Sequence, residues 1–413
     1  MTGTVVVVGA GQGGFQAAAS LRDEGYAGRI LLVGEEPGLP YQRPPLSKAY
    51  LTGRADEASI RLRSASFFHE RSIELVQDRA TAIDRDAGQL HCASGARLAY
   101  DHLVLATGAR NRSLPVPGAE LDGVFYLRTL PDAEALRPRL AEARRAVVIG
   151  AGFIGLEFAA VASAMGLDVT VLEATSRPMS RAVSLPISAF FREAHEAAGI
   201  AMEFGSVAAR ILGEGSRAEA VETMDGREVP ADLVLVGIGV VPNVELAAEA
   251  GLAIANGISV DEHLLTADPA ISAIGDCASY PSAFAGGAAT RLESVQNAVD
   301  QARSVAARIA GRPRPYRAIP WFWSDQGPLK LQIAGLAIPH ETTILRGDPG
   351  SASFSVFCFD GPRLVGVESV NRAADHMIAR RLLAVAGPGL TREEAADAGL
   401  DLRQRALELL GSS

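Results

Sequence analysis

Hydrophobic and polar positions at the start of the chain change period twice. Thr4–Val8 is a run of β-branched residues that ends at once in a glycine-rich turn. An alanine-rich stretch with a helical pattern then runs to Glu24, and a second apolar run at residues 29–33 ends at Gly34 and Glu35. This order predicts a strand, a tight turn, a helix and a second strand that ends at an acid.

The same order of elements recurs in the middle of the chain. Arg145–Ile149 leads into a second glycine-rich turn, a helical pattern runs to about Met165, and residues 168–172 end at Glu173. The repeat predicts two copies of one nucleotide-binding design within a single chain.

Further elements follow each copy in the same order. Residues 80–100 and 207–229 alternate in hydropathy between turn signals, which predicts a small antiparallel meander in each place. Residues 101–108 and 231–239 are then buried-strand runs that close on glycine. The downstream parts therefore support the duplication.

The pattern changes again after Pro320, where strands rich in Val, Ile and Phe alternate with helices. Before Pro320 we expect a strand at 271–276 and a helix at 293–310. After it, the expected strands are 330–334, 342–345, 353–359 and 363–370, and the expected helices are 373–386 and 391–410. We therefore predict an α/β protein with two Rossmann-like dinucleotide-binding domains and a separate C-terminal α+β domain.

Composition removes several classes of function. The formal charge of −9 and a pI near 5.4 oppose a general affinity for nucleic acid or an anionic membrane. Cys92, Cys277 and Cys358 are isolated, without a CxxC pair, and build neither a disulfide framework nor a metal site. No apolar run approaches the roughly 18 residues that span a bilayer. We expect a cytoplasmic protein without a bound metal, and the excess of glycine, 42 residues, to lie at particular turns.

Both glycine-rich turns read GxGxxG. Their first glycine makes the bend, the second lets a pyrophosphate approach the backbone, and the third lets the helix pack on the strand. Gly9, Gly11 and Gly14 fit the first copy, and Gly150, Gly152 and Gly155 fit the second. An acid about 20 residues further on accepts hydrogen bonds from an adenosine ribose, and Glu35 and Glu173 fit this position. A carboxylate at Glu173 also repels the 2′-phosphate of NADPH, so NADH is the expected coenzyme.

Two dinucleotides in one chain indicate a flavin and a nicotinamide, with hydride passing between them. A proline-rich segment at residues 39–48 follows the first copy and ends at Lys48. Rigid prolines suit a wall against a flat ring, and Lys48 would be a cation near a flavin that becomes anionic on reduction. The alternative is a solvated surface loop.

Several segments together resemble a known family. They are YQRPPLSKAYL at 41–51, GAGFIGLEF at 150–158, GIG at 237–239, GDC at 275–277, ESVQNA at 293–298 and PWFWSDQ at 320–326. This ordered set resembles the FAD-dependent, NADH-using ferredoxin reductases of bacterial oxygenase systems, the putidaredoxin reductase-like group of the glutathione-reductase-like flavoproteins. The resemblance implies an FAD domain at 1–111 and 242–319, an inserted NAD domain at 112–241 and a C-terminal domain at 320–413.

The resemblance also implies site residues. Those expected to hold non-covalent FAD are Gly9, Gly11, Gly13, Gly14, Glu35, Arg43, Lys48, Ala80, Thr107, Gly108, Arg128, Asp276 and Val295. Those expected to hold NADH are Gly150, Gly152, Ile154, Gly155, Glu173 and Gly239. Those expected to act in the chemical step are Pro45, Lys48, Glu157 and Trp323. Val295 would begin a helix at the pyrimidine edge of the flavin, where backbone N–H groups stabilise negative charge.

Three of these residues have simpler readings that the sequence leaves open. Glu157 fits an early-helix acid favoured by the helix dipole. Asp276 fits a cap for the next helix. Trp323, like its neighbour Trp321, fits core or interdomain packing, and for Trp321 this reading is favoured.

The implied activity is NADH:ferredoxin reductase. Hydride passes from NADH to N5 of FAD, and single electrons then go to a 2Fe–2S ferredoxin that feeds a cytochrome P450 monooxygenase. A ring-hydroxylating dioxygenase is the alternative terminal enzyme. An NADH oxidase or peroxidase is disfavoured because residues 39–48 hold no cysteine, and a redox-sensing, nucleic-acid-associated flavoprotein is disfavoured by the charge.

An acidic ferredoxin needs a basic patch on an otherwise acidic reductase. Five arginines and no acid occur between residues 303 and 317, where the alternative is a merely solvated face. We expect docking near Arg303, Arg308, Arg312 and Trp323, on a monomer or weak dimer.

Overall fold

The computed structural model describes residues 3–385 and 389–411 and divides the chain into two compact units. The first unit takes in the chain up to Gln42, Asp56–Arg110 and Val241–Pro320. The second takes in Arg43–Ala55, Asn111–Val240 and the chain from Trp321 onward. The finer boundaries expected at residues 111, 241 and 319 stay a prediction.

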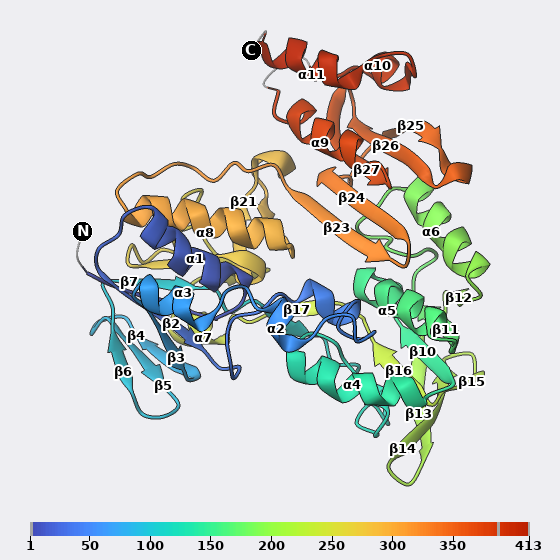
Figure 1. The fold of residues 1–413 in the computed structure, drawn as a ribbon, viewed down its shortest axis with the longest axis horizontal. Helices are drawn as coiled ribbons and strands as arrows, with labels where there is room; N and C mark the ends of the chain where they lie inside the picture. Colours follow the sequence, from blue (N-terminus) through green and yellow to red (C-terminus); the bar gives the residue numbers. More distant parts are fainter. Residues whose placement is uncertain (1–2, 386–388, 412–413) are drawn as a thin grey trace. The chain divides into compact units, whose positions relative to one another are not determined.

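A five-stranded parallel sheet forms the centre of the first unit (Figure 1). Its order is β20 (Ile271–Ala273), β7 (His102–Leu105), β1 (Thr4–Val8), β2 (Arg29–Gly34) and β3 (Ile73–Gln77). Val6 pairs with Leu31 on one side and with Leu103 on the other, and all three are buried. Helices α1 (Gln12–Asp23) and α8 (Val295–Ile309) pack side by side. Strands buried on both faces explain the continuous apolar runs in the sequence.

Smaller elements complete the first unit. An antiparallel meander contains β4 (Ala80–Asp84), β5 (Gln89–Cys92) and β6 (Arg97–Ala99). A four-stranded sheet contains β18 (Ile254–Ala255), β19 (Gly257–Ser259), β21 (Ala278–Pro281) and β22 (Ala289–Thr290). The helices are α2 (Glu57–Ile60), α3 (Ala65–Glu70) and α7 (Glu245–Glu249). Strands β8 (Ala109–Asn111) and β17 (Val240–Pro242) pair where the chain passes between the units.

The second unit repeats the design. Its parallel sheet has the order β12 (Ala201–Phe204), β11 (Asp168–Glu173), β10 (Arg145–Ile149), β16 (Leu233–Val236) and β9 (Val124–Phe125). Its meander contains β13 (Ala208–Glu214), β14 (Arg217–Thr223) and β15 (Glu228–Pro230). The helices are α4 (Leu130–Glu142), α5 (Phe153–Ala164) and α6 (Leu185–Ala197). In both sheets the first strand lies between the second strand and the strand that follows the meander, so the predicted duplication is confirmed.

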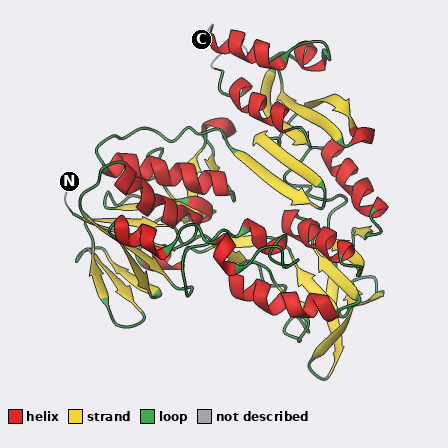
Figure 2. Cartoon of the chain, in the orientation of Figure 1, coloured by secondary structure: helices red, strands yellow, loops and turns green. Residues whose placement is uncertain are grey.

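The C-terminal part of the second unit is an antiparallel sheet with helices packed on it (Figure 2). The order is β23 (Trp321–Gln326), β24 (Leu329–Gly335), β27 (Arg363–Val370), β26 (Ser353–Asp360) and β25 (Thr342–Asp348). Helices α9 (Ala373–Leu382), α10 (Arg392–Ala396) and α11 (Leu402–Gly411) follow. Phe357 and Phe359 pack with Ala379 and Leu409 in one core. The predicted α+β character of this part is confirmed.

Three details of the C-terminal part differ from the sequence prediction. Strand β23 was not expected, because only the strands from residue 330 onward were predicted. The helix expected at 391–410 is two helices, since the Asp397 side chain accepts a hydrogen bond from the Gly399 amide in a turn between them. The helix expected at 373–386 ends at Leu382, and residue 386 lies outside the described residues.

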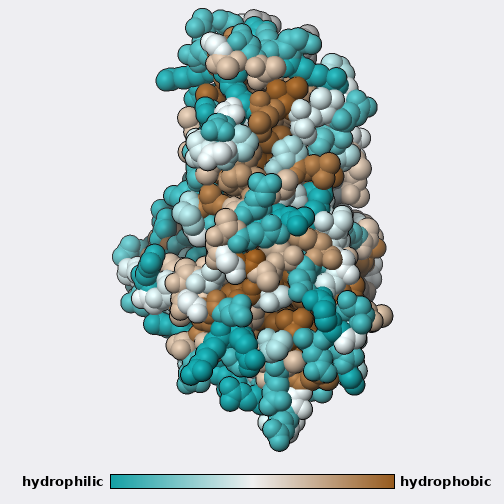
Figure 3. Space-filling view, turned by 90° about the vertical axis from the view of Figure 1, so that its right-hand side faces the viewer, coloured by the Kyte–Doolittle hydropathy of each residue, from teal (hydrophilic) through white to brown (hydrophobic). Residues whose placement is uncertain are grey.

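The surface carries polar and apolar side chains in small groups. Figure 3 shows this mixture on one face of the molecule. In the second unit the most exposed large hydrophobic side chains include Leu185, Met224 and Met377. Among the described helices, none is both long and apolar enough to cross a membrane.

Candidate functional site

The three glycines of the first turn have different structural reasons to lack a side chain. Gly9 has φ of +106°, and a Cβ there would lie 2.2 Å from the Ala106 carbonyl oxygen. A Cβ on Gly14 would lie 1.8 Å from the Gly9 oxygen, so this glycine lets the helix pack against the strand. A Cβ on Gly11, the N-cap of α1, would meet nothing within 4 Å. Protein packing therefore does not require glycine at position 11, whereas a phosphate approaching the helix N-terminus does.

The second turn reproduces this arrangement. Gly150 also has φ of +106°, and a Cβ on Gly155 would lie 2.2 Å from the Gly150 oxygen. Gly152 caps α5, and the nearest atom to a Cβ there is the Gly237 oxygen at 3.9 Å. Both turns are thus preformed cradles with an open second glycine, and the residues present fit two dinucleotides.

The two acids end equivalent strands but differ in their contacts. Glu35 follows β2 and is exposed, and among the described residues no group donates a hydrogen bond to its carboxylate. Glu173 ends β11 and accepts hydrogen bonds from the Ala151 amide at 2.7 Å and from the amide and hydroxyl of Thr175, both at 2.8 Å. Glu173 is therefore held next to the second turn, as a ribose ligand there requires.

Arginines near Glu173 bear on the choice of coenzyme. Arg177 donates hydrogen bonds to the Val183 carbonyl at 2.9 Å and to the Ser180 carbonyl at 2.8 Å, so its guanidinium braces the local backbone. Arg181 is exposed, and its terminal nitrogen lies 3.5 Å from the position of a Cβ on Gly239. Of these two arginines, only Arg181 keeps its guanidinium on the surface beside Gly239, one of the expected nicotinamide contacts.

The remaining flavin candidates of the first unit lie at strand ends. Thr107 donates to the Asn243 carbonyl at 2.7 Å and its own carbonyl accepts from the Asn243 side chain at 2.9 Å. The Gly108 carbonyl accepts from the Asn243 amide at 2.9 Å. Ala80 begins β4. Asn243 was not expected from the sequence, and it fixes the backbone of two candidate residues.

Helix α8 begins at Val295, where the sequence places a helix N-terminus. The Ser294 side chain caps it by accepting from the Asn297 amide at 3.0 Å. Asp276 lies in the short helix that follows β20 and therefore is not the cap of α8. Gln301 on α8 accepts from the Gly275 amide at 2.7 Å and ties this turn to the helix.

Lys48 and Glu157 form an ion pair in the second unit. Lys48 Nζ lies 2.6 Å from Glu157 Oε2, and the Ser47 hydroxyl donates to the same oxygen at 2.5 Å. Glu157 is only 3% exposed and stands in the second turn of α5, beyond the reach of a simple dipole preference. A buried carboxylate is stable only with such partners. The segment that ends at Lys48 is thus packed against α5, and it is not a solvated loop.

Neighbours of this pair come from the same proline-rich segment. Lys48 also donates to the Pro44 carbonyl at 3.3 Å, and Pro45 accepts from the Lys48 amide at 3.0 Å in a 3₁₀ turn. Arg43 donates to the Arg128 carbonyl at 2.6 Å. Arg128 lies two residues before α4. Its hydrogen bond with Arg43 brings it close to the segment that also holds the candidates Pro45 and Lys48.

Trp323 is half-buried on β23 beside Trp321. Their ring centroids are 5.6 Å apart with an interplanar angle of 34°. Trp321 also packs on His376 and carries Arg380 over its ring. The expected packing role of Trp321 is consistent with these contacts, and Trp323 forms the other member of an aromatic pair.

The three cysteines are buried and free. Burial raises the pKa of Cys92, Cys277 and Cys358, which disfavours the thiolate at each. Among the described residues no cluster of His, Cys, Asp or Glu could hold a metal ion.

The arginine cluster is not a single exposed patch. Arg303 is exposed and lies 3.3 Å from Asp300, and Arg312 is paired with Glu24. Arg308 turns inward, where it donates to Ser272 Oγ at 2.5 Å and lies 3.1 Å from His102 Nε2. These contacts disfavour the expected docking role of Arg308, because its guanidinium is half-buried and bonded within the first unit; the role stays a prediction.

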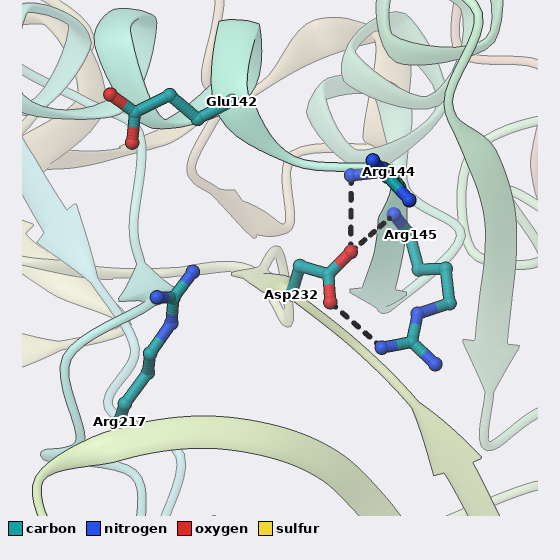
Figure 4. A pocket seen from close by; sticks show the side chains of 5 residues that line it. All are labelled: Glu142, Arg144, Arg145, Arg217 and Asp232. Atoms are coloured by element: carbon teal, nitrogen blue, oxygen red, sulfur yellow. Dashed lines mark hydrogen bonds and ion pairs between the residues drawn. The ribbon is translucent and has the colours of Figure 1, made fainter.

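A surface pocket of about 440 Å³ lies at the start of strands β10 and β16 (Figure 4). The Asp232 carboxylate accepts from the backbone amides of Arg144 and Arg145 at 3.1 and 3.0 Å, while Glu142 and Arg217 stand apart from it. Parallel sheets bind nucleotides at the carboxyl ends of their strands. This pocket lies at the opposite edge of the sheet, away from the turn where the coenzyme is expected.

Some residues around Glu157 were missed by the sequence prediction. Ser47 and Ser324 both donate to its carboxylate. Thr175, which donates to Glu173, was missed as well. Ser47 and Ser324 stand inside the recognised segments YQRPPLSKAYL and PWFWSDQ, so their segments were visible but their contacts were not.

Comparisons with known proteins agree on one family. The pyridine nucleotide-disulphide oxidoreductase family matches residues 3–302, and the reductase C-terminal family matches residues 321–406. Rhodocoxin reductase of Rhodococcus erythropolis is 54% identical over 97% of this chain and 93% of its own length. The ferredoxin reductase for the CYP199A2 system from Rhodopseudomonas palustris is 53% identical, with a TM-score of 0.96 over 98% of this chain and 99% of that one. The reductase of the covalent putidaredoxin reductase–putidaredoxin complex is 39% identical, with a TM-score of 0.94 over 99% and 98%.

Proposed function

Because the chain belongs to the pyridine nucleotide-disulphide oxidoreductases that carry a reductase C-terminal domain, we propose that it is an NADH:ferredoxin reductase of a cytochrome P450 system. The chain is an oxidoreductase of the ferredoxin reductase family, which uses FAD and NAD(H). The finer points of the proposal are the preference for NADH, a 2Fe–2S ferredoxin as the partner, and a P450 as the terminal enzyme.

One observation carries the proposal: the chain holds two preformed dinucleotide cradles and no accessible thiol. Gly11 and Gly152 leave open space at the N-termini of α1 and α5. FAD at the first turn and NADH at the second fit this duplication, with Glu35 and Glu173 as the ribose ligands. Since every cysteine is buried, electrons do not leave through a disulfide of this chain.

FAD, when bound, would supply the acceptor for a hydride from NADH and the donor of single electrons. The residues of the chain orient the two coenzymes and place charge around them. Lys48, whose Nζ lies 2.6 Å from Glu157 Oε2, would supply a positive charge that favours negative charge on the flavin. In the first unit, the N-terminus of α8 at Val295 would supply backbone N–H groups that favour negative charge.

Electrons then go to an external iron–sulfur protein. Trp323 is a half-buried aromatic group on β23, and Arg303, Arg314 and Arg317 are exposed basic groups of the first unit. An acidic ferredoxin is steered by such basic groups. The solved complex of putidaredoxin reductase with putidaredoxin supports a ferredoxin as the partner.

The terminal enzyme is a proposal by similarity. The relative with a TM-score of 0.96 is a ferredoxin reductase for the CYP199A2 system, which favours a P450. A ring-hydroxylating dioxygenase is the alternative that the experiment has to separate.

The test follows electrons from NADH in the purified flavoprotein. NADH should bleach the visible flavin absorbance in a stopped-flow experiment without oxygen. Reduction of cytochrome c should then require an added 2Fe–2S ferredoxin. Rapid oxidation of NADH by oxygen with no ferredoxin would contradict a reductase and support an oxidase. Reconstitution with ferredoxin–P450 pairs and with ferredoxin–dioxygenase pairs distinguishes the two terminal enzymes.

A further inference from the structure

The ion pair between Lys48 and Glu157 uses only one oxygen of the Glu157 carboxylate. Oε2 accepts from Lys48 and Ser47, as described above. The other oxygen, Oε1, accepts from the hydroxyl of Ser324 at 2.7 Å. Ser324 is fully buried and comes from β23, a strand of the C-terminal sheet. The C-terminal sheet therefore contacts the candidate catalytic carboxylate directly.

The hydrogen bonds continue beyond Ser324. The side-chain amide of Gln326 lies 3.3 Å from Ser324 Oγ, and its Oε1 lies 2.8 Å from His195 Nε2 on α6. Gln326 is 2% exposed and His195 is 4% exposed. The result is a buried chain of side chains from α6 through β23 to α5.

In this row of hydrogen-bonded side chains, each donor points toward Glu157. A hydroxyl has one proton, and Ser324 gives it to the carboxylate, so Ser324 Oγ accepts from the amide of Gln326. Gln326 Oε1 then accepts, which places the proton of the His195 ring on Nε2. Burial lowers the pKa of His195, so the ring is neutral near pH 7 and carries one N–H donor. Hydrogen bonds in one direction strengthen one another.

The alternation of side chains along β23 explains how one strand supplies two members of this hydrogen-bonded row. Successive side chains of a strand point to opposite faces. Ser324 and Gln326 share the buried face with Phe322, whose ring packs 4.5 Å from Phe153 of α5. Trp321 and Trp323 share the other face. The strand thus seats its polar residues on the nucleotide-binding part of the same unit.

We propose that Ser324, Gln326 and His195 are positioning residues that hold Glu157, and through it Lys48, in the geometry that hydride transfer from NADH requires. The proposal rests on the function proposed above. Among the described residues, only the Ser324 hydroxyl donates to Glu157 Oε1, and a buried charged oxygen without a partner is costly, which favours a shift of its side chain. Small displacements near reacting groups cost on the order of a hundredfold in rate.

The experiment compares Ser324→Ala with wild type in single-turnover reduction of the flavin by NADH. We expect the limiting rate to fall by roughly ten- to a hundredfold, with little change in the NADH concentration at half-saturation. The deuterium isotope effect on transfer from C4-deuterated NADH should rise. Ser324→Thr keeps the hydroxyl and should recover most of the rate, and Gln326→Met should show a smaller loss than Ser324→Ala.

Ser355→Ala is the matched control. Ser355 is also fully buried in the C-terminal sheet, and its hydroxyl bonds the Asp375 carboxylate at 2.9 Å, away from Glu157. This variant should lower stability and leave the rate of flavin reduction unchanged. The inference is overturned if Ser324→Ala reduces its flavin at the wild-type rate, or if Ser355→Ala slows reduction equally.

The outcome for wild type separates this inference from the proposed function. If NADH fails to reduce the wild-type flavin, the proposed function fails. If NADH reduces wild type and Ser324→Ala equally well, the function stands and only the positioning role fails. The identity of the ferredoxin affects neither measurement.

Discussion

The carboxylate of Glu368 on β27 lies 3.0 Å from the backbone nitrogen of Ser184, the residue that precedes helix α6. The Ser184 hydroxyl makes no capping hydrogen bond to α6, and the buried carboxylate of Glu368 accepts from the backbone N–H of this N-cap residue. Burial raises the pKa of Glu368 to about 7, although the hydrogen bonds from Ser184 act in the other direction. A helix of the nucleotide-binding part is thus joined to the C-terminal sheet through a group that titrates near neutrality.

This relationship predicts how stability changes with pH. The folded protein binds the Glu368 proton more tightly than the unfolded chain, whose glutamates titrate near 4.5. The contribution of Glu368 to stability is therefore largest below pH 4.5 and is lost as pH rises from 4.5 to about 7. Glu368→Gln should remove this loss and raise the free energy of unfolding at pH 8 by about 2–3 kcal/mol. Denaturant unfolding of the flavoprotein at pH 5 and pH 8 measures it.

An exposed glutamate of the same part provides the control. Glu341→Gln should leave the pH dependence as in wild type, because Glu341 is exposed. A Glu368→Gln protein with an unchanged difference between the two pH values would show that Glu368 does not titrate in this range.

The second turn predicts opposite effects for two glycine substitutions. Gly152→Ala has room in the protein, since its Cβ approaches only the Gly237 oxygen at 3.9 Å. Its methyl group would occupy space that the diphosphate needs, so the KM for NADH should rise at least about tenfold, equivalent to about 1.4 kcal/mol. Gly155→Ala would place a Cβ 2.2 Å from the Gly150 oxygen and should lower the melting temperature. Steady-state kinetics and thermal unfolding separate the two. An unchanged KM in Gly152→Ala would place the coenzyme elsewhere.

Coenzyme preference should depend on Glu173. Its replacement by Ala removes the ribose ligand and the repulsion of a 2′-phosphate, so the preference for NADH should collapse by about tenfold or more in kcat/KM. Thr175→Val removes one hydroxyl donor to Glu173 and should shift the preference less, in the same direction. Ratios of kcat/KM for NADH and NADPH provide the measurement. Equal use of both coenzymes by wild type would contradict this role of Glu173.

Arg303 and Arg308 should behave differently although both belong to the basic cluster. Arg303→Glu should slow ferredoxin reduction several-fold, more strongly at low salt, and leave the NADH–ferricyanide activity intact. Arg308→Met should instead destabilise the fold, because it removes a half-buried donor to Ser272. Arg97 is exposed on strand β6. Arg97→Glu changes the net charge by the same amount as Arg303→Glu and should leave ferredoxin reduction unchanged. Equal slowing by Arg97→Glu would point to net charge, not docking.

The sequence predicted the two nucleotide-binding halves because their signals are local. A β-branched run, a GxGxxG turn and a strand-end acid are each visible within a few tens of residues. The strand limits at Thr4–Val8 and Arg145–Ile149 are the predicted ones. The pairing of distant strands into equivalent sheets then follows from the duplication.

Strand β23 was missed because its buried face is polar. A hydropathy pattern assigns the aromatic side chains inward, whereas the structure buries Ser324 and Gln326 fully and leaves Trp323 half-buried. Apart from each other, the two polar groups have Glu157, Met179 and His195 as partners, and all three lie more than a hundred residues earlier in the chain. No local pattern contains that information.

The inward orientation of Arg308 could not be predicted for a related reason. A run of charged residues in the sequence does not show which face of a helix each side chain occupies. Arg303 and Arg308 are five residues apart on α8, about 140° around its axis, so they lie on different faces. Arg308 consequently falls beside buried Val305 and Ile309, where it meets His102, whose pKa burial lowers to about 3.

The buried cysteines also make the protein its own reporter of local opening. A thiol-reactive dye labels only molecules whose core has been exposed, since all three thiols are buried. Cys92 and Cys277 share one core of the first unit, and Cys358 lies in strand β26 of the second. The order in which these sites become labelled would show which unit opens first, without any engineered label.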